Sequence, residues 1–104
     1  MNVEHWQEQL RTFAEERDWL QFHTPKNLAM ALSVEASELL EIFQWLTPEQ
    51  SLRVMSEERA AEVEDEVADV MIYLLRLVDV LGVQLDDEVA RKFRRNKMRF
   101  PTSG

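Results

Sequence analysis

The sequence has no cysteine, only two glycines and three prolines, and no long uninterrupted hydrophobic run. Without cysteine there are no disulfides, thiolate metal ligands or cysteine nucleophile. The absence of disulfides is compatible with a reducing cellular compartment. Two glycines are too few for a phosphate-binding glycine loop or a dinucleotide-binding fingerprint. The most apolar stretch, 67–81, is interrupted by Asp69, Arg76 and Asp79 and is too short to span a membrane. The acidic, amphipathic N-terminus does not resemble a signal peptide, so we expect a cytoplasmic protein with no membrane contact.

The residues that are abundant favour helices. Ala, Leu, Glu, Arg and Met dominate, and alternation typical of strands is absent, which predicts an all-α protein. The length of 104 residues fits one domain, 1–104. Start and stop signals divide it into a bundle of four to five helices, expected at about 3–18, 25–45, 48–55, 57–81 and 87–99.

The expected helix boundaries follow from capping residues. Thr24-Pro25 and Thr47-Pro48 each combine a hydroxyl N-cap with a proline in the first turn, and Gln50 completes a capping box with Thr47. Ser56 is expected to cap the longest helix, which Gly82 ends. Either Asp86 or Asp87 is expected to cap the last helix, Phe100-Pro101 to end it, and 102–104 to fray.

Charge is distributed unevenly along the chain. All 20 acidic residues and only six basic ones lie in 1–90, while 91–99 carries the other six basic residues. The basic helix either contacts phosphates or is a solvated helix end that complements the helix dipole. The acidic body argues against binding of nucleic acid.

Glu35 is in an unusual place for a charged residue. On a helix over 28–46 it lies in the middle of an apolar stripe formed by Leu28, Leu32, Leu39, Ile42 and Leu46. A buried, unpaired carboxylate costs several kcal/mol. A cation shared with other carboxylates would remove that cost, so Glu35 predicts a metal site.

Three further acids have a matching spacing. Glu38 lies three residues after Glu35, and Glu66 and Asp69 repeat this spacing in the longest helix. If the two helices pack antiparallel, the four carboxylates converge and offer oxygen ligands that suit Mg²⁺ or Mn²⁺. Neighbouring acids extend this surface: Glu41, Glu62 and Asp65. The alternative is that Glu66 and Asp69 belong to an ordinary solvated face that also carries Arg76.

Other metal chemistries are less well supported. A di-iron bundle needs Glu-x-x-His pairs, and neither His5 nor His23 follows a glutamate at that spacing.

A group of aromatic residues lies near the ends of the first two helices and suits a slot that stacks a nucleobase: Trp19, Phe22, His23 and Trp45. The alternatives are that the tryptophans close the core and that His23 is a hydrogen-bonding loop residue.

Five motifs together resemble the MazG-type all-α nucleoside triphosphate pyrophosphohydrolases, and most of all the small dCTP pyrophosphatase branch. The resemblance covers nearly the whole chain and lies in 13–19 (FAEERDW), 22–28 (FHTPKNL), 35–45 (EASELLEIFQW), 66–74 and 92–101. One departure is Leu10, where some dCTP-specific relatives carry a histidine.

The resemblance implies hydrolysis of an NTP to an NMP and pyrophosphate by a homodimer or homotetramer whose site is shared between subunits. It implies Mg²⁺ on Glu35, Glu38, Glu66 and Asp69, with Glu38 or Glu41 activating water. A base pocket of Trp19, His23, Trp45 and Tyr73 is implied as well, with phosphate contacts from Lys26, Lys92 and Asn96. Other functions remain open: a catalytically silent nucleotide-binding module, a helical oligomerisation domain, or a nucleic-acid binder that uses 91–99.

Overall fold

The computed structural model describes residues 1–102, which form five α-helices and two short 3₁₀ helices without any strand. In chain order they are α1 (Val3–Glu16), η1 (Leu20–Phe22), α2 (Pro25–Phe43), α3 (Pro48–Ser51), η2 (Val54–Ser56), α4 (Ala60–Leu81) and α5 (Leu85–Arg99). The predicted all-α class is confirmed. The fraying expected at the C-terminus falls mostly on 103–104, which lie outside the described residues.

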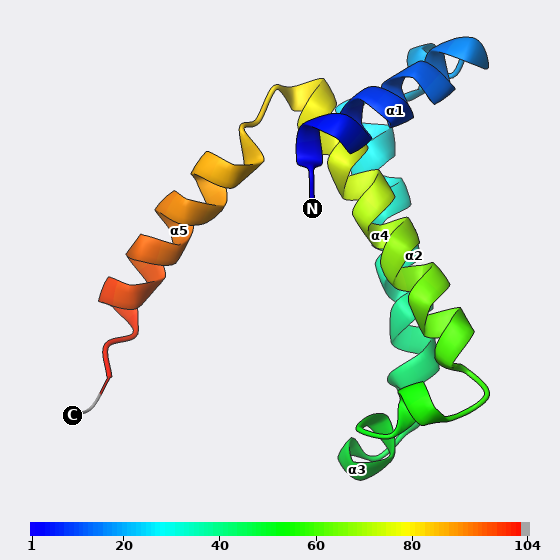
Figure 1. Ribbon diagram of the computed structural model, residues 1–104, viewed down its shortest axis with the longest axis vertical. Helices are drawn as coiled ribbons and strands as arrows, with labels where there is room; N and C mark the ends of the chain where they lie inside the picture. The colour runs from blue at the N-terminus through cyan, green and yellow to red at the C-terminus, as the bar shows by residue number, and fades with distance from the viewer. Residues whose placement is uncertain (103–104) are drawn as a thin grey trace.

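Helices α2 and α4 lie side by side and antiparallel, and they form the long axis of the molecule (Figure 1). The turn through α3 closes one end of this hairpin, while α1 crosses its other end and packs on α4. Helix α5 leads away from the body beyond Gly82. None of the helices in residues 1–102 combines the length and apolar character needed to cross a lipid bilayer.

The chain is extended for its size. Its radius of gyration is 16.9 Å, whereas a compact domain of this length has about 13 Å. Apolar side chains are correspondingly exposed on three helices: Met30, Val34 and Leu40 on α2, Val67 and Leu81 on α4, and Val89, Phe93 and Met98 on α5. Exposed apolar surfaces of this kind are typical of interaction sites between proteins.

The two ends of the α2–α4 hairpin are held by different contacts. At the α3 end, Ile42, Val54 and Val63 form a buried cluster against which Leu39, Phe43 and Leu46 pack. At the other end, Arg11 of α1 forms a bidentate ion pair with Asp79 of α4, at 2.7 and 3.0 Å. The acidic residues predicted to bind metal lie between these two ends.

Several predicted caps are confirmed. Thr24 Oγ1 accepts a hydrogen bond from the backbone N–H of Asn27 at 3.2 Å, and Thr47 and Gln50 form the predicted capping box. Gly82 ends α4 in the left-handed region, with a φ of 70°, a conformation in which a side chain is disfavoured.

Other predicted boundaries are wrong. Ser56 does not cap α4, because its hydroxyl donates to the carbonyl of Arg53 at 2.7 Å and the helix begins only at Ala60. Asp86 and Asp87 lie inside the first turn of α5, where they complement the helix dipole, and Gln84 precedes the helix. The first two long helices end two residues early, at Glu16 and Phe43, and the short third helix ends at Ser51.

Candidate active site

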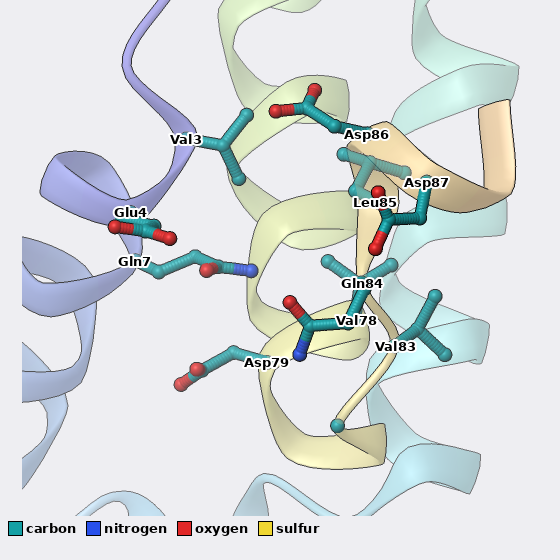
Figure 2. A pocket seen from close by; sticks show the side chains of 11 residues that line it. Val3, Glu4, Gln7, Val78, Asp79, Val83, Gln84, Leu85, Asp86 and Asp87 are labelled. Atoms are coloured by element: carbon teal, nitrogen blue, oxygen red, sulfur yellow. The ribbon is translucent and has the colours of Figure 1, made fainter. Parts of the chain in front are cut away.

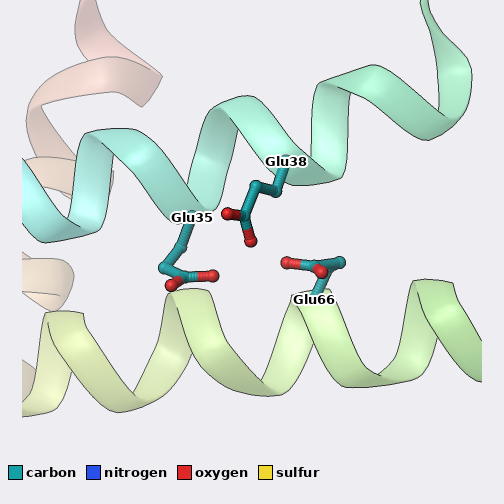
Figure 3. A group of neighbouring side chains, drawn as sticks. All are labelled: Glu35, Glu38 and Glu66. Carbon is teal, nitrogen blue, oxygen red and sulfur yellow. The ribbon is translucent and has the colours of Figure 1, made fainter.

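Three carboxylates meet in the middle of the α2–α4 hairpin. Glu35 and Glu38 point from α2 toward α4, and Glu66 points back from α4 (Figure 3). Each offers a carboxylate oxygen, and these oxygens all lie within 4.8 Å of one another. The antiparallel packing on which the sequence prediction depended therefore brings three of the four predicted metal ligands together.

Two oxygens of this cluster are buried without a partner. Glu35 Oε2 and Glu66 Oε2 are inaccessible to solvent and accept no hydrogen bond from any residue in 1–102. Burial is the main reason why the pKa of Glu35 is raised to about 7, and the neighbouring Glu38, Asp69 and Glu66 raise it further. Burial also raises the pKa of Glu66, with the charge of Glu38 as the next cause. The carboxylates of the cluster thus lie close enough together to disfavour the charged form of Glu35 and of Glu66.

The residues present fit a divalent cation. Unpartnered carboxylate oxygens are hard ligands of the kind that Mg²⁺ and Mn²⁺ prefer, and a cation would relieve both the burial cost and the repulsion. A purely structural network would instead supply hydrogen-bond donors to buried carboxylates, and Glu35 Oε2 and Glu66 Oε2 have none within residues 1–102. The cluster is therefore a candidate metal site.

Asp69, the fourth predicted ligand, lies at the edge of the cluster. It follows Glu66 by one helical turn, and its charge contributes to the raised pKa values of Glu35 and Glu66. It also lines a neighbouring cavity. The alternative is that Glu66 and Asp69 belong to a solvated face that also carries Arg76. It does not fit Glu66, which has a buried oxygen, or Arg76, whose side chain is only 4% exposed.

The neighbouring cavity has an aromatic wall and a volume of about 360 Å³. Trp19, His23 and Tyr73, three of the predicted base-pocket residues, line it, together with Leu10, Phe13, Ala14, Asp69, Ile72 and Arg76. Phe13 and Trp19 meet edge to face with ring centroids 5.5 Å apart. We call this hollow the aromatic cavity.

A tight turn after α1 places Trp19 and His23 in the aromatic cavity. Asp18 adopts a φ of 56°, which turns the chain back so that the Trp19 N–H donates to the carbonyl of Ala14 at 2.9 Å. Asp tolerates this left-handed conformation better than most residues. The short helix η1 follows. Asn27 Nδ2 donates to the carbonyl of Phe22, the last residue of η1, at 3.0 Å.

The sequence did not predict a series of polar contacts that connects His23 to Arg76 and Asp79. Arg76 Nε donates to His23 Nδ1 at 3.2 Å, and Arg76 Nη1 donates to Asp79 Oδ2 at 3.0 Å. Asp79 is in turn the partner of Arg11. An arginine within the apolar stretch of α4, three residues before an aspartate, was the available signal for this arrangement.

Residues 30–103 match the MazG-like family, and this range contains all three clustered carboxylates. The chain belongs to the MazG-like family. The family predicted from the sequence motifs is thereby confirmed.

Individual relatives of this MazG-like chain carry related names. It is 43% identical to dCTP pyrophosphatase 1 of Homo sapiens and 41% identical to that of Mus musculus, each over 90 residues. The aligned part is 86% of this chain and 53% of each relative, so the chain spans about half the length of the curated relatives it matches. A crystal structure of a pyrophosphatase from Archaeoglobus fulgidus is 44% identical, with a TM-score of 0.91 over 98% of this chain and 94% of that chain.

Other predicted site residues of the MazG-like chain lie elsewhere. Trp45 is 86% exposed and lies two residues beyond the C-terminal end of α2, whereas Trp19 precedes the N-terminal end of that helix. Lys26 lies on the face of α2 opposite Glu35 by helical position. Lys92 and Asn96 line a surface hollow formed by α5 alone, and Glu41 is exposed outside the three-carboxylate cluster. The structure therefore brings together only some of the predicted site residues.

A second hollow, about 310 Å³ in volume, lies where α1, α4 and α5 meet (Figure 2). Its acidic lining residues are Glu4, Asp79, Asp86 and Asp87. Carboxylates repel phosphate groups, and Asp79 is already paired with two arginines. This hollow is therefore a poor nucleotide site compared with the aromatic cavity.

Proposed function

We propose that this MazG-like chain is a Mg²⁺-dependent nucleoside triphosphate pyrophosphohydrolase, which converts an NTP and water to an NMP and pyrophosphate. The observation that carries the proposal is the cluster of Glu35, Glu38 and Glu66, with two buried unpartnered oxygens, beside the aromatic cavity. The names of the relatives, dCTP pyrophosphatase and pyrophosphatase, support the same reaction class.

The proposed cation ligands are Glu35, Glu38, Glu66 and Asp69, and either Mg²⁺ or Mn²⁺ suits these oxygens. A cation held by these residues would neutralise phosphate charge and would make water more acidic. The raised pKa of Glu35 means that this carboxylate takes up a proton readily in the metal-free state, so cation binding displaces that proton.

The chemical step needs a base close to the α-phosphate. We assign that role to Glu38 or Glu41, which lie one turn apart on α2. The carboxylate accepts a proton from the attacking water, the water oxygen bonds to the α-phosphorus, and the bond from that phosphorus to the pyrophosphate oxygen breaks. We do not assign this role to His23, because its Nδ1 already accepts a hydrogen bond from Arg76 Nε.

The aromatic cavity is proposed to hold the base. Trp19, His23 and Tyr73 line it, and an aromatic wall stacks on a base whatever its identity. A cavity lined by large rings should accommodate a pyrimidine better than a larger purine. We therefore propose dCTP or a 5-substituted dCTP as the substrate. This activity fits house-cleaning of the cytoplasmic nucleotide pool.

A second copy of the chain is proposed to complete the site as a homodimer or homotetramer. Lys92 and Asn96 share one face of α5 with the exposed Val89 and Phe93, so a protein surface that covers the apolar pair also encloses the polar pair. Trp45, Lys92 and Asn96 then reach the substrate from a neighbouring copy.

Hydrolysis of a nucleotide panel in water enriched in ¹⁸O tests the proposal. The panel contains the standard dNTPs and 5-substituted dCTPs with Mg²⁺, and the products are identified by mass spectrometry. We expect dCMP that carries the label together with unlabelled pyrophosphate, because the attack is at the α-phosphorus.

Three other results would contradict the proposal. Label in pyrophosphate would place the attack elsewhere, and nucleotide binding without pyrophosphate release would indicate a silent binding module. Binding of neither Mg²⁺ nor nucleotide would indicate an oligomerisation domain.

Asp69→Asn is expected to abolish turnover. Substantial activity of this variant would show that Asp69 is not a metal ligand.

A further inference from the structure

The buried Arg76 links His23 to a carboxylate on the opposite side of its guanidinium. Its Nε donates to His23 Nδ1 at 3.2 Å and its Nη1 donates to Asp79 Oδ2 at 3.0 Å. Asp79 also accepts two hydrogen bonds from Arg11, at 3.0 Å on the same Oδ2 and at 2.7 Å on Oδ1. The guanidinium is therefore held in one orientation.

This contact determines where the proton of His23 resides. A guanidinium carries only donors, so the His23 Nδ1 that it contacts must present a lone pair. The proton of the neutral imidazole is then on Nε2. Burial lowers the pKa of His23, with the charge of Arg76 as a second cause, so the ring also resists a second proton.

The neutral ring with its proton on Nε2 lines the aromatic cavity next to Trp19 and Tyr73. We propose that Arg76 is a positioning residue that holds His23 as the Nε2–H tautomer, so that the aromatic cavity selects a ring with a hydrogen-bond acceptor on its edge. This inference rests on the proposed function for the identity of the ring, and cytosine offers such acceptors at O2 and N3.

The first test reads the tautomer without using activity. The ¹⁵N chemical shifts of an imidazole distinguish a protonated from an unprotonated nitrogen, and the chain has only two histidines, so His5→Gln identifies the signals of His23. We expect the wild type to carry its proton on Nε2. We expect both tautomers in Arg76→Met, and no change in Arg53→Met, which makes the same substitution at an exposed arginine.

Arg76→Leu provides a second variant in case Arg76→Met does not fold. Its side chain has no hydrogen-bond donor, so a mixture of tautomers is again expected. A wild-type proton on Nδ1 would overturn the proposal. So would an unchanged tautomer in the folded variants of Arg76.

The second test asks whether the tautomer affects selection. Loss of one neutral hydrogen bond should raise the KM for dCTP about 3- to 10-fold in Arg76→Met and change kcat by less than about twofold. In His23→Gln the side-chain amide of the glutamine is a donor whether or not Arg76 is present. Adding Arg76→Met to His23→Gln should therefore change KM by less than about twofold.

The kinetic test also has a clear contrary result. An equal loss in both backgrounds would show that Arg76 acts by packing alone and would overturn the proposal. If the wild type cleaves no nucleotide, the proposed function fails, while the ¹⁵N shifts still decide whether Arg76 sets the tautomer.

Discussion

Glu35 and Glu66 face each other from antiparallel helices, and each has one carboxylate oxygen that is buried without a hydrogen-bond partner among residues 1–102 (Figure 3). Two such groups repel each other across the helix interface while packing at both ends of the hairpin holds them together. The metal-free protein is therefore destabilised at this point of the helix interface, and a bound cation would remove that destabilisation.

Glu35→Gln should reduce Mg²⁺-dependent turnover of dCTP at least about a hundredfold, because it removes a charged ligand at a site where no histidine can replace it. Steady-state release of pyrophosphate measures the effect. Glu64→Gln, an exposed glutamate on α4, is the matched control and should retain activity. Substantial turnover in Glu35→Gln would remove Glu35 from the metal site.

The stability of the metal-free protein should fall as pH rises from about 5 to about 8. The pKa of Glu35 rises from 4.5 to about 7 on folding, so between these values the folded state binds the proton more tightly than the unfolded state does. The melting temperature of the wild type relative to Glu35→Gln reports this dependence, because the difference cancels titration of His23, whose lowered pKa acts in the opposite direction.

Glu35→Gln should accordingly melt at a higher temperature than the wild type at about pH 8 without metal, and the gap should close toward about pH 5. Addition of Mg²⁺ should raise the melting temperature of the wild type only. A lower melting temperature for metal-free Glu35→Gln at about pH 8 would contradict charge crowding in the cluster.

The chain should be oligomeric at micromolar concentration by light scattering. Phe93→Ser should shift it toward smaller species, because Phe93 belongs to the exposed apolar face of α5 beside Val89. Met98→Ser removes an apolar side chain that is 84% exposed on another face of α5 and should leave the mass unchanged. A wild-type monomer would refute association.

Trp45→Ala should raise the KM for dCTP more than it lowers kcat, since stacking contributes about 1–3 kcal/mol per base to binding in the ground state and the transition state alike. Initial rates over a range of dCTP concentrations separate the two constants. Equal turnover of dATP or dGTP by the wild type would show that the pyrimidine assignment is wrong and would leave the hydrolase assignment intact.

Local rules predicted much of the fold. The caps at Thr24, Thr47 and Gly82 depend on a few neighbouring residues, and the structure confirms each of them. Ser56 satisfied the same local rule but bonds to Arg53 instead, because the chain makes a 3₁₀ turn before α4 begins. A hydroxyl that has two local partners cannot be assigned from sequence alone.

The candidate site was predictable where it depends on helical periodicity. Glu35 and Glu38 share a helix face, so their convergence with Glu66 needed only antiparallel packing. Arg76 was not predictable in this way. Its role depends on His23, which is 53 residues away in the sequence, and a helical wheel holds no information about such a partner.

The order of contacts along the chain also affects how the protein folds. Ile42, Val54 and Val63 form a cluster within a short stretch of sequence, so the entropy lost in closing that loop is small. Residues of the aromatic cavity extend from Leu10 to Arg76, and their contacts require closure of a much longer loop. The hairpin is therefore expected to nucleate at the α3 turn, and the end that carries the cavity is the last to form.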